Sequence, residues 1–192
     1  MLPALTRLED ALLDGNPFGP PAMAALAAGL QSAPASLRCL YLSSCFDREP
    51  NAMLATLAPS LAHTAIHTLA LDDNGITDMS PLFALVPQLP LRALNLGRNR
   101  FTDPLPADLG QLESLNLAWC SLPEASFQPW EHVLQSQLQM LNLTGNALHN
   151  THFLSTFLLA CPGLTELTLD NCNLPAAAMQ GLVAALPSYV RP

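Results

Sequence analysis

Lysine is absent from the 192 residues of this chain, whose seven basic residues are all arginines set against 15 acidic ones. The formal net charge at pH 7 is −8, and the sequence has no run of basic residues. Because phosphate groups are bound mainly by clustered lysine and arginine, this composition disfavours nucleic acids and anionic membranes as partners. The missing lysines also leave no side-chain site for ubiquitin attachment, although codon bias is the simpler explanation for their absence.

Long apolar runs are also missing, although half of the residues are hydrophobic. The longest apolar helical stretch, residues 22–30, is far shorter than the roughly 20 residues that cross a bilayer. At the amino terminus, Glu9 and Asp10 interrupt the segment in which a cleaved export signal has its apolar core. The sequence therefore predicts a cytoplasmic protein, or one delivered into a host cell by a route that needs no signal peptide.

Motifs of catalysis and metal binding are lacking too. The five cysteines contain no C-x-x-C pair, and their odd number fits a reducing compartment. There is no G-x-S-x-G elbow, phosphate-binding loop, G-x-G-x-x-G or H-E-x-x-H motif. His63 and His67 lead into a predicted strand, so they lack the helical geometry that brings two ligands to one metal. The sequence predicts no cofactor, no metal and no enzyme activity.

A repeat is what the sequence does contain. Seven units follow the pattern L-x-x-L-x-L-x-x-(N/C)-x-L and begin near residues 8, 37, 66, 91, 112, 138 and 164. Within each unit the fourth and sixth positions alternate with period two, which predicts one short strand with those side chains turned inward. We expect one domain over residues 1–192, since the period leaves no linker between units.

Between the strands, the chain has to return along the other side of the predicted sheet. Helical spacing and flanking prolines predict helices within residues 19–34, 53–62, 80–86 and 151–160, and a last helix at about 176–186. The fourth unit, which begins near residue 91, is too short for more than a turn or a 3₁₀ segment in its return. Cys45, Cys120 and Cys172 take the ninth position, where asparagine or cysteine is expected to turn inward and bond backbone groups.

Two local features extend this interpretation. With N-x-F-G at residues 16–19, A-M-A-A-L-A-A-G-L at residues 22–30 and a mixture of asparagine and cysteine at the ninth position, the chain resembles leucine-rich repeat proteins of the ribonuclease-inhibitor-like class. The resemblance implies an α/β fold, a right-handed horseshoe-shaped solenoid with a parallel sheet on its concave face and helices and irregular turns on its convex face. The short fourth unit and the proline-rich returns are also similar to bacterial leucine-rich repeat proteins, including effectors. Because the family serves many partners, the resemblance implies a protein or peptide ligand and names none.

The outward positions of the units form columns across the predicted face. The candidate partner-binding residues in these columns are Trp119, Arg98, Tyr41, Asn95, Asn116, Asn142 and Met140. Trp119 is the first choice, because tryptophan and arginine are enriched among the residues that dominate binding energies. Arg98 lies one strand away, so the two side chains either form a stacked cation-π surface for a partner or merely cover each other.

The polar residues of the face allow two interpretations each. Asn95, Asn116 and Asn142 either read a peptide backbone or bond one another in a ladder, and we expect the ladder. The acidic residues at the edges form either a solvated rim, which we expect, or a field that steers a basic partner. These acidic residues are Asp14, Asp72, Asp73 and Asp170.

The predicted function is a non-enzymatic protein-protein interaction module that is monomeric rather than homo-oligomeric. One alternative is the substrate-recognition part of a larger enzyme, or an unrecognised hydrolytic site around His149 and His152. Another is self-assembly through the edge of the first strand, before which the sequence shows no capping element.

Overall fold

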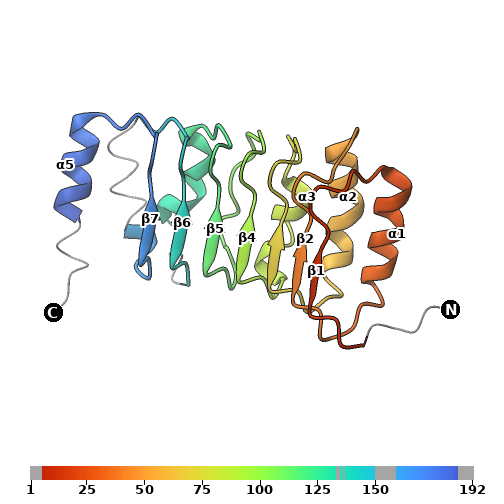
Figure 1. Cartoon of the computed structure of the whole chain (residues 1–192). Coiled ribbons are helices and arrows are strands. Elements are labelled where there is room, and N and C mark those ends of the chain that lie inside the picture. Colours follow the sequence, from red (N-terminus) through yellow and green to blue (C-terminus); the bar gives the residue numbers. More distant parts are fainter. Residues whose placement is uncertain (1–5, 133–134, 136, 150–158, 186–192) are drawn as a thin grey trace.

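The computed structural model describes residues 6–132, 135, 137–149 and 159–185. In this part of the chain, seven parallel strands lie in one sheet in the order of the sequence (Figure 1). They are β1 (Asp10–Leu12), β2 (Cys39–Tyr41), β3 (Thr68–Ala70), β4 (Ala93–Asn95), β5 (Ser114–Asn116), β6 (Met140–Asn142) and β7 (Glu166–Thr168). Equivalent positions pair from unit to unit, as Leu40 does with Leu69, so the parallel sheet predicted from the pattern is confirmed.

The returns between the strands differ from unit to unit. They contain α1 (Pro20–Leu30), α2 (Pro50–Leu61), α3 (Ser80–Phe83), the 3₁₀ helices η1 (Val86–Gln88) and η2 (Glu124–His132), and α5 (Ala176–Ala185). Proline stands in the first turn of α1, α2 and α3, where its fixed φ favours the helix and its missing N–H costs nothing. Most of the helix expected at residues 151–160 lies outside the described residues. Figure 1 shows α1, α2 and α3 together on one side of the sheet near β1 to β3.

The return of the fourth unit contains no helix, as its length predicts. From Phe101 to Leu112 the chain has no regular secondary structure apart from one bend and one turn. This segment buries Phe101, Leu105 and Leu109 at every fourth residue, and the Phe101 ring meets Phe83 edge-on with centroids 5.6 Å apart. Apart from the turn near Gly110, the segment is therefore held mainly by its packing.

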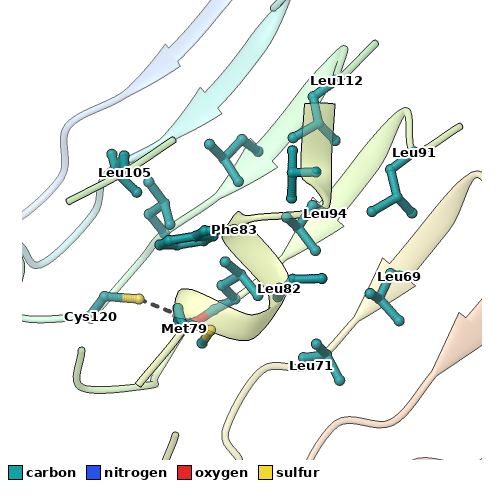
Figure 2. Packing of buried hydrophobic residues seen from close by; sticks show 14 of the residues in the cluster. Leu69, Leu71, Met79, Leu82, Phe83, Leu91, Leu94, Leu105, Leu112 and Cys120 are labelled. Carbon is teal, nitrogen blue, oxygen red and sulfur yellow. Dashed lines mark hydrogen bonds between the residues drawn. The ribbon is translucent and has the colours of Figure 1, made fainter. Parts of the chain in front are cut away.

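The core lies between the sheet and the returns. Figure 2 shows leucines in or directly after the strands facing α3 and the residue before it, namely Leu69, Leu71 and Leu94 beside Met79, Leu82 and Phe83. All six are less than a tenth exposed. Burying one leucine contributes roughly 1.5–3 kcal/mol relative to leaving it in water. The inward fourth and sixth positions predicted from the repeat are thus the ones that stabilise the sheet.

Apart from exposed Asn16, the ninth-position residues are buried and bond backbone groups, as predicted. The Asn74 amide nitrogen donates to the carbonyl oxygens of Leu42 (2.8 Å) and Leu71 (2.9 Å), while its oxygen accepts the N–H of Cys45 (2.7 Å). The Cys120 thiol donates to the Leu96 carbonyl oxygen at 3.2 Å (Figure 2). Burial raises the pKa of the Cys120 thiol to about 12, so it stays protonated and able to donate at neutral pH.

Candidate functional site

The face of the sheet opposite this core carries the third-position and fifth-position side chains of the strands. The seventh and eighth residues of each unit continue it at the carboxyl ends of the strands. We call these positions together the open face. Its side chains are mostly half-buried or exposed, whereas the fourth and sixth positions beneath them are mostly buried.

The eighth position has an unusual backbone in every unit. All seven residues there have φ between +54° and +72°: Gly15, Ser44, Asp73, Arg98, Trp119, Gly145 and Asn171. The left-handed conformation costs a non-glycine residue roughly 1–2 kcal/mol. Four of these positions hold glycine, asparagine or aspartate, the residue types that adopt the left-handed conformation most readily. This preference is the feature of the sequence from which the left-handed eighth position could have been predicted. Tryptophan is not such a type, so the fold holds Trp119 in a conformation that its own preferences disfavour.

The Trp119 side chain lies across the next unit. Its indole is 48% exposed and covers Gly145 so closely that a Cβ added there would lie 2.3 Å from ring atoms Cδ2 and Cε3. In the described residues no cation-π pair joins Arg98 to Trp119, so the structure does not show the stacked alternative of the two that the sequence left open. The indole turns to the unit after its own, because the glycine there leaves room for it. Sequence reasoning missed Gly145 as the residue that positions Trp119.

Replacing Gly145 by alanine is therefore expected to move the indole. The new methyl group collides with the ring, and φ of +72° is strained for any residue with a Cβ. We expect a loss of about 1–2 kcal/mol in the free energy of unfolding and stronger acrylamide quenching of Trp119 fluorescence. Trp130, the other tryptophan, is fully buried and contributes little quenching. Unchanged quenching would show that the indole does not rest on Gly145; Gly15→Ala, with φ +71° and nothing nearby, is the matched control for the strain.

The asparagine column does not form the predicted ladder. Asn95, Asn116 and Asn142 each accept, through Oδ1, the backbone N–H two residues further on, at 3.0–3.1 Å. Since a backbone N–H only donates, these bonds fix which end of each amide faces the backbone. The N–H₂ groups of Asn116 and Asn142 have no hydrogen-bond partner among the described residues. The ladder prediction is wrong, and the column instead presents donors to the open face.

A hollow of about 300 Å³ lies in the open face between β2 and β5. Its polar lining is Tyr41, Ser43, Thr68, Asp72, Asn95, Ser114 and Asn116. Burial first, and then the neighbouring Cys39 and the Asp10 and Asp14 carboxylates, raise the pKa of the Tyr41 hydroxyl. The phenol therefore stays neutral at physiological pH and is available as a hydrogen-bonding group.

The other candidate residues lie apart from this hollow. Met140, the first residue of β6 and the third position of its unit, is 43% exposed and pairs with Ser114 of β5. The Arg98 side chain is exposed, in the unit before Trp119. His149 follows β6, whereas His152, its partner in the hydrolytic alternative, lies outside the described residues. The described part of the chain contains no group of three histidine, cysteine or acidic residues placed to hold a metal ion.

A second hollow lies at the amino-terminal end of the sheet. It has a volume of about 590 Å³ and is lined mainly by apolar residues of β1, α1 and the segments beside them, such as Leu8, Leu26 and Leu37. Among the described residues no element covers it. Within the described part of the chain, the apolar lining of this hollow is therefore accessible.

None of the described helices is both long and apolar enough to span a membrane. The Leucine Rich Repeat family model matches residues 90–112, the segment that contains β4 and the helix-free return. No curated protein matches the chain. Leucine-rich repeat domains generally mediate protein-protein interactions and are typically non-enzymatic. With the parallel sheet and its in-register units, the match supports a leucine-rich repeat protein.

Proposed function

We propose that this chain is a non-enzymatic module that binds a protein or peptide across its open face. The observation that carries the proposal is Trp119, a large aromatic residue held half exposed by a left-handed backbone and by its contact with Gly145. Tryptophan is enriched among the residues that dominate binding energies. Exposed Met140 adds apolar surface, and the N–H₂ groups of Asn116 and Asn142, which have no partner among the described residues, add directed donors.

In its full form, the proposal makes the open face the concave side of a right-handed horseshoe of about seven repeats of the ribonuclease-inhibitor-like class. Supporting this form are the seven in-register strands and the helices on the opposite side of the sheet at its amino-terminal end. The proposed setting is the cytoplasm, where five unpaired cysteines remain reduced. A stable complex would bury at least about 1,000 Å².

Affinity capture from bacterial and eukaryotic cytosols tests the proposal. Trp119→Ala is expected to lose the captured partner through a penalty of about 2 kcal/mol or more, roughly 30-fold in Kd. Met179→Ala is the matched control, because Met179 is also 48% exposed but belongs to α5, away from the open face. A partner held equally by wild type and Trp119→Ala would contradict the proposal.

A narrower form of the proposal makes the chain a bacterial effector that acts on host proteins. It is supported by the short fourth unit, the proline-rich returns and the missing lysines. A translocation reporter fused to the chain tests this form in infected cells. Absence of translocation would contradict it and leave the binding function intact.

Self-assembly is the second candidate function, and the apolar hollow at β1 favours it. A second copy would cover Leu8, Leu26 and Leu37 and pair with the free edge of β1. Light scattering should then show a mass that rises with concentration. A mass that stays at 20.5 kDa at all concentrations would contradict self-assembly.

A further inference from the structure

The amino-terminal half of the open face carries more net negative charge than the rest, where Glu166 and Asp170 are accompanied by Arg98. In the first three units, its positions hold Asp10, Asp14, Asp72 and Asp73 and no basic residue. The salt bridges of the described residues join Arg48 to Asp47 and Arg92 to Glu113, so none neutralises these four carboxylates. Complementary charge accelerates encounter and selects partners. This half of the open face is therefore suited to a basic partner.

Within this half, the Asp72 carboxylate is fixed at the hollow between β2 and β5. Its Oδ1 accepts hydrogen bonds from the Ser43 hydroxyl and from the Asn95 amide nitrogen, both at 2.7 Å. Its Oδ2 has no hydrogen-bond partner among the described residues. Two bonds thus hold the carboxylate in place and leave one charged oxygen for a donor from outside.

The rest of the hollow fits a single basic side chain. Its volume of about 300 Å³ lies at the lower end of the range for small-molecule sites. Tyr41 supplies an aromatic ring, on which a guanidinium stacks readily. Thr68 and Ser114 add hydroxyl groups that accept hydrogen bonds from a guanidinium, which only donates.

We propose that the hollow binds an arginine side chain of an extended segment of the protein partner, with Asp72 as its counter-charge. This inference rests on the proposed function and names the chemistry of the partner. The free N–H₂ group of Asn116 lies at the same hollow and is a donor for a backbone carbonyl of the segment. Tyr41, Asp72 and Asn116, from the second, third and fifth units, thus line one site for the segment of the partner.

Synthetic peptides with acetyl and amide ends provide the probe. The first is Ala-Ala-Arg-Ala-Ala, and the second replaces arginine by citrulline, which keeps the shape and removes the charge. Binding is followed at millimolar concentration by shifts of ¹⁵N-labelled backbone amides. The arginine peptide is expected to move amides around Tyr41, Asp72 and Asn95, and the citrulline peptide to bind about tenfold more weakly. Free arginine is the third ligand and is expected to bind more weakly than the peptide, because it lacks the flanking backbone.

Two variants distinguish binding of arginine at Asp72 from a general attraction to the acidic residues of the open face. Asp72→Asn keeps an oxygen that accepts from Ser43 and Asn95 and removes only the charge, so its Kd for the arginine peptide should rise about tenfold. Asp73→Asn removes a charge one residue away, outside the hollow, at a left-handed position that asparagine tolerates. It should change the Kd less than about threefold, as expected for a screened charge.

The results with the peptides and with the Asp72 and Asp73 variants test the arginine site independently of the proposed function. No binding of the arginine peptide, equal binding of the citrulline peptide or of free arginine, or equal effects of Asp72→Asn and Asp73→Asn would each overturn the inference. If Trp119→Ala loses the captured partner while Asp72→Asn keeps it, the proposed function is supported and the proposed arginine site is overturned. If Asp72→Asn loses the arginine peptide while Trp119→Ala captures the partner as wild type does, the arginine site is supported and the proposed role of Trp119 is overturned.

Discussion

Asn99→Ala is expected to lower the free energy of unfolding by about 3–5 kcal/mol. The Asn99 side chain is fully buried, and its amide nitrogen donates to the carbonyl oxygens of Leu71 and Leu96, both at 2.9 Å. Its oxygen accepts the N–H groups of Asn74 (3.2 Å) and Ile76 (3.0 Å). Alanine leaves the N–H groups of Asn74 and Ile76 without this acceptor, whereas the Leu71 and Leu96 carbonyl oxygens each keep one other donor, from Asn74 and from Cys120. Each orphaned N–H group costs about 1–3 kcal/mol, and each carbonyl loses one of its two hydrogen bonds.

Urea unfolding followed by far-ultraviolet circular dichroism measures this loss. Asn16→Ala is the matched control, because Asn16 has the same repeat position but is exposed and bonds only carbonyls of its own unit. We expect it to cost less than about 1 kcal/mol. Asn99→Cys should fall between the two, since the Cys120 thiol makes one such bond in the next unit. Equal losses for Asn16→Ala and Asn99→Ala would show that the buried bonds between units do not stabilise the fold.

The sequence predicts this network because the whole repeat is a local pattern. In a strand, side chains two residues apart point to the same face, so the leucines at the fourth and sixth positions both face the core. The ninth residue follows at a fixed spacing, which places it in the loop after the strand. The in-register pairing of Leu40 with Leu69 follows from the same spacing. The sheet, the helices of the first units, the helix-free fourth return and the inward ninth positions were accordingly all predictable.

The arrangement of the open face was not predictable in the same way. The direction of the Trp119 side chain depends on its left-handed backbone and on the free space above Gly145 in the next unit. The spacing of the leucines predicts neither of these. The asparagines likewise had two kinds of partner within reach, neighbouring amides and their own backbone. Each asparagine oxygen accepts the backbone N–H two residues further on, because that N–H lies in the same loop and would otherwise lack an acceptor.

The helix-free fourth return also depends on a residue that the repeat pattern does not mark. Trp130 of η2 is fully buried and its indole N–H donates to the Pro106 carbonyl oxygen at 2.8 Å. Its ring meets Phe127 edge-on with centroids 5.8 Å apart. The backbone N–H of Leu105 also donates to the Ser126 carbonyl oxygen at 2.8 Å. Since the fourth return has no helix of its own, these contacts with the fifth return hold it in place.

Trp130→Ala is therefore expected to cost about 3–5 kcal/mol in the free energy of unfolding, as is usual when a buried aromatic residue is truncated. Trp130→Phe keeps the ring but leaves the Pro106 carbonyl without its donor, so we expect about 1–2 kcal/mol. The graded pair keeps the prediction testable if the alanine variant does not fold. Both losses are measured by urea unfolding with circular dichroism.

Trp119→Ala is the control that separates stability from binding, because its indole is 48% exposed while that of Trp130 is buried. It should cost less than about 1 kcal/mol in unfolding and yet abolish capture of the partner. Trp130→Phe should show the reverse, with lower stability and unchanged capture at a temperature where it is folded. If both variants lost stability and binding together, Trp119 would be a structural residue of the loops, and the open face would have no tryptophan anchor.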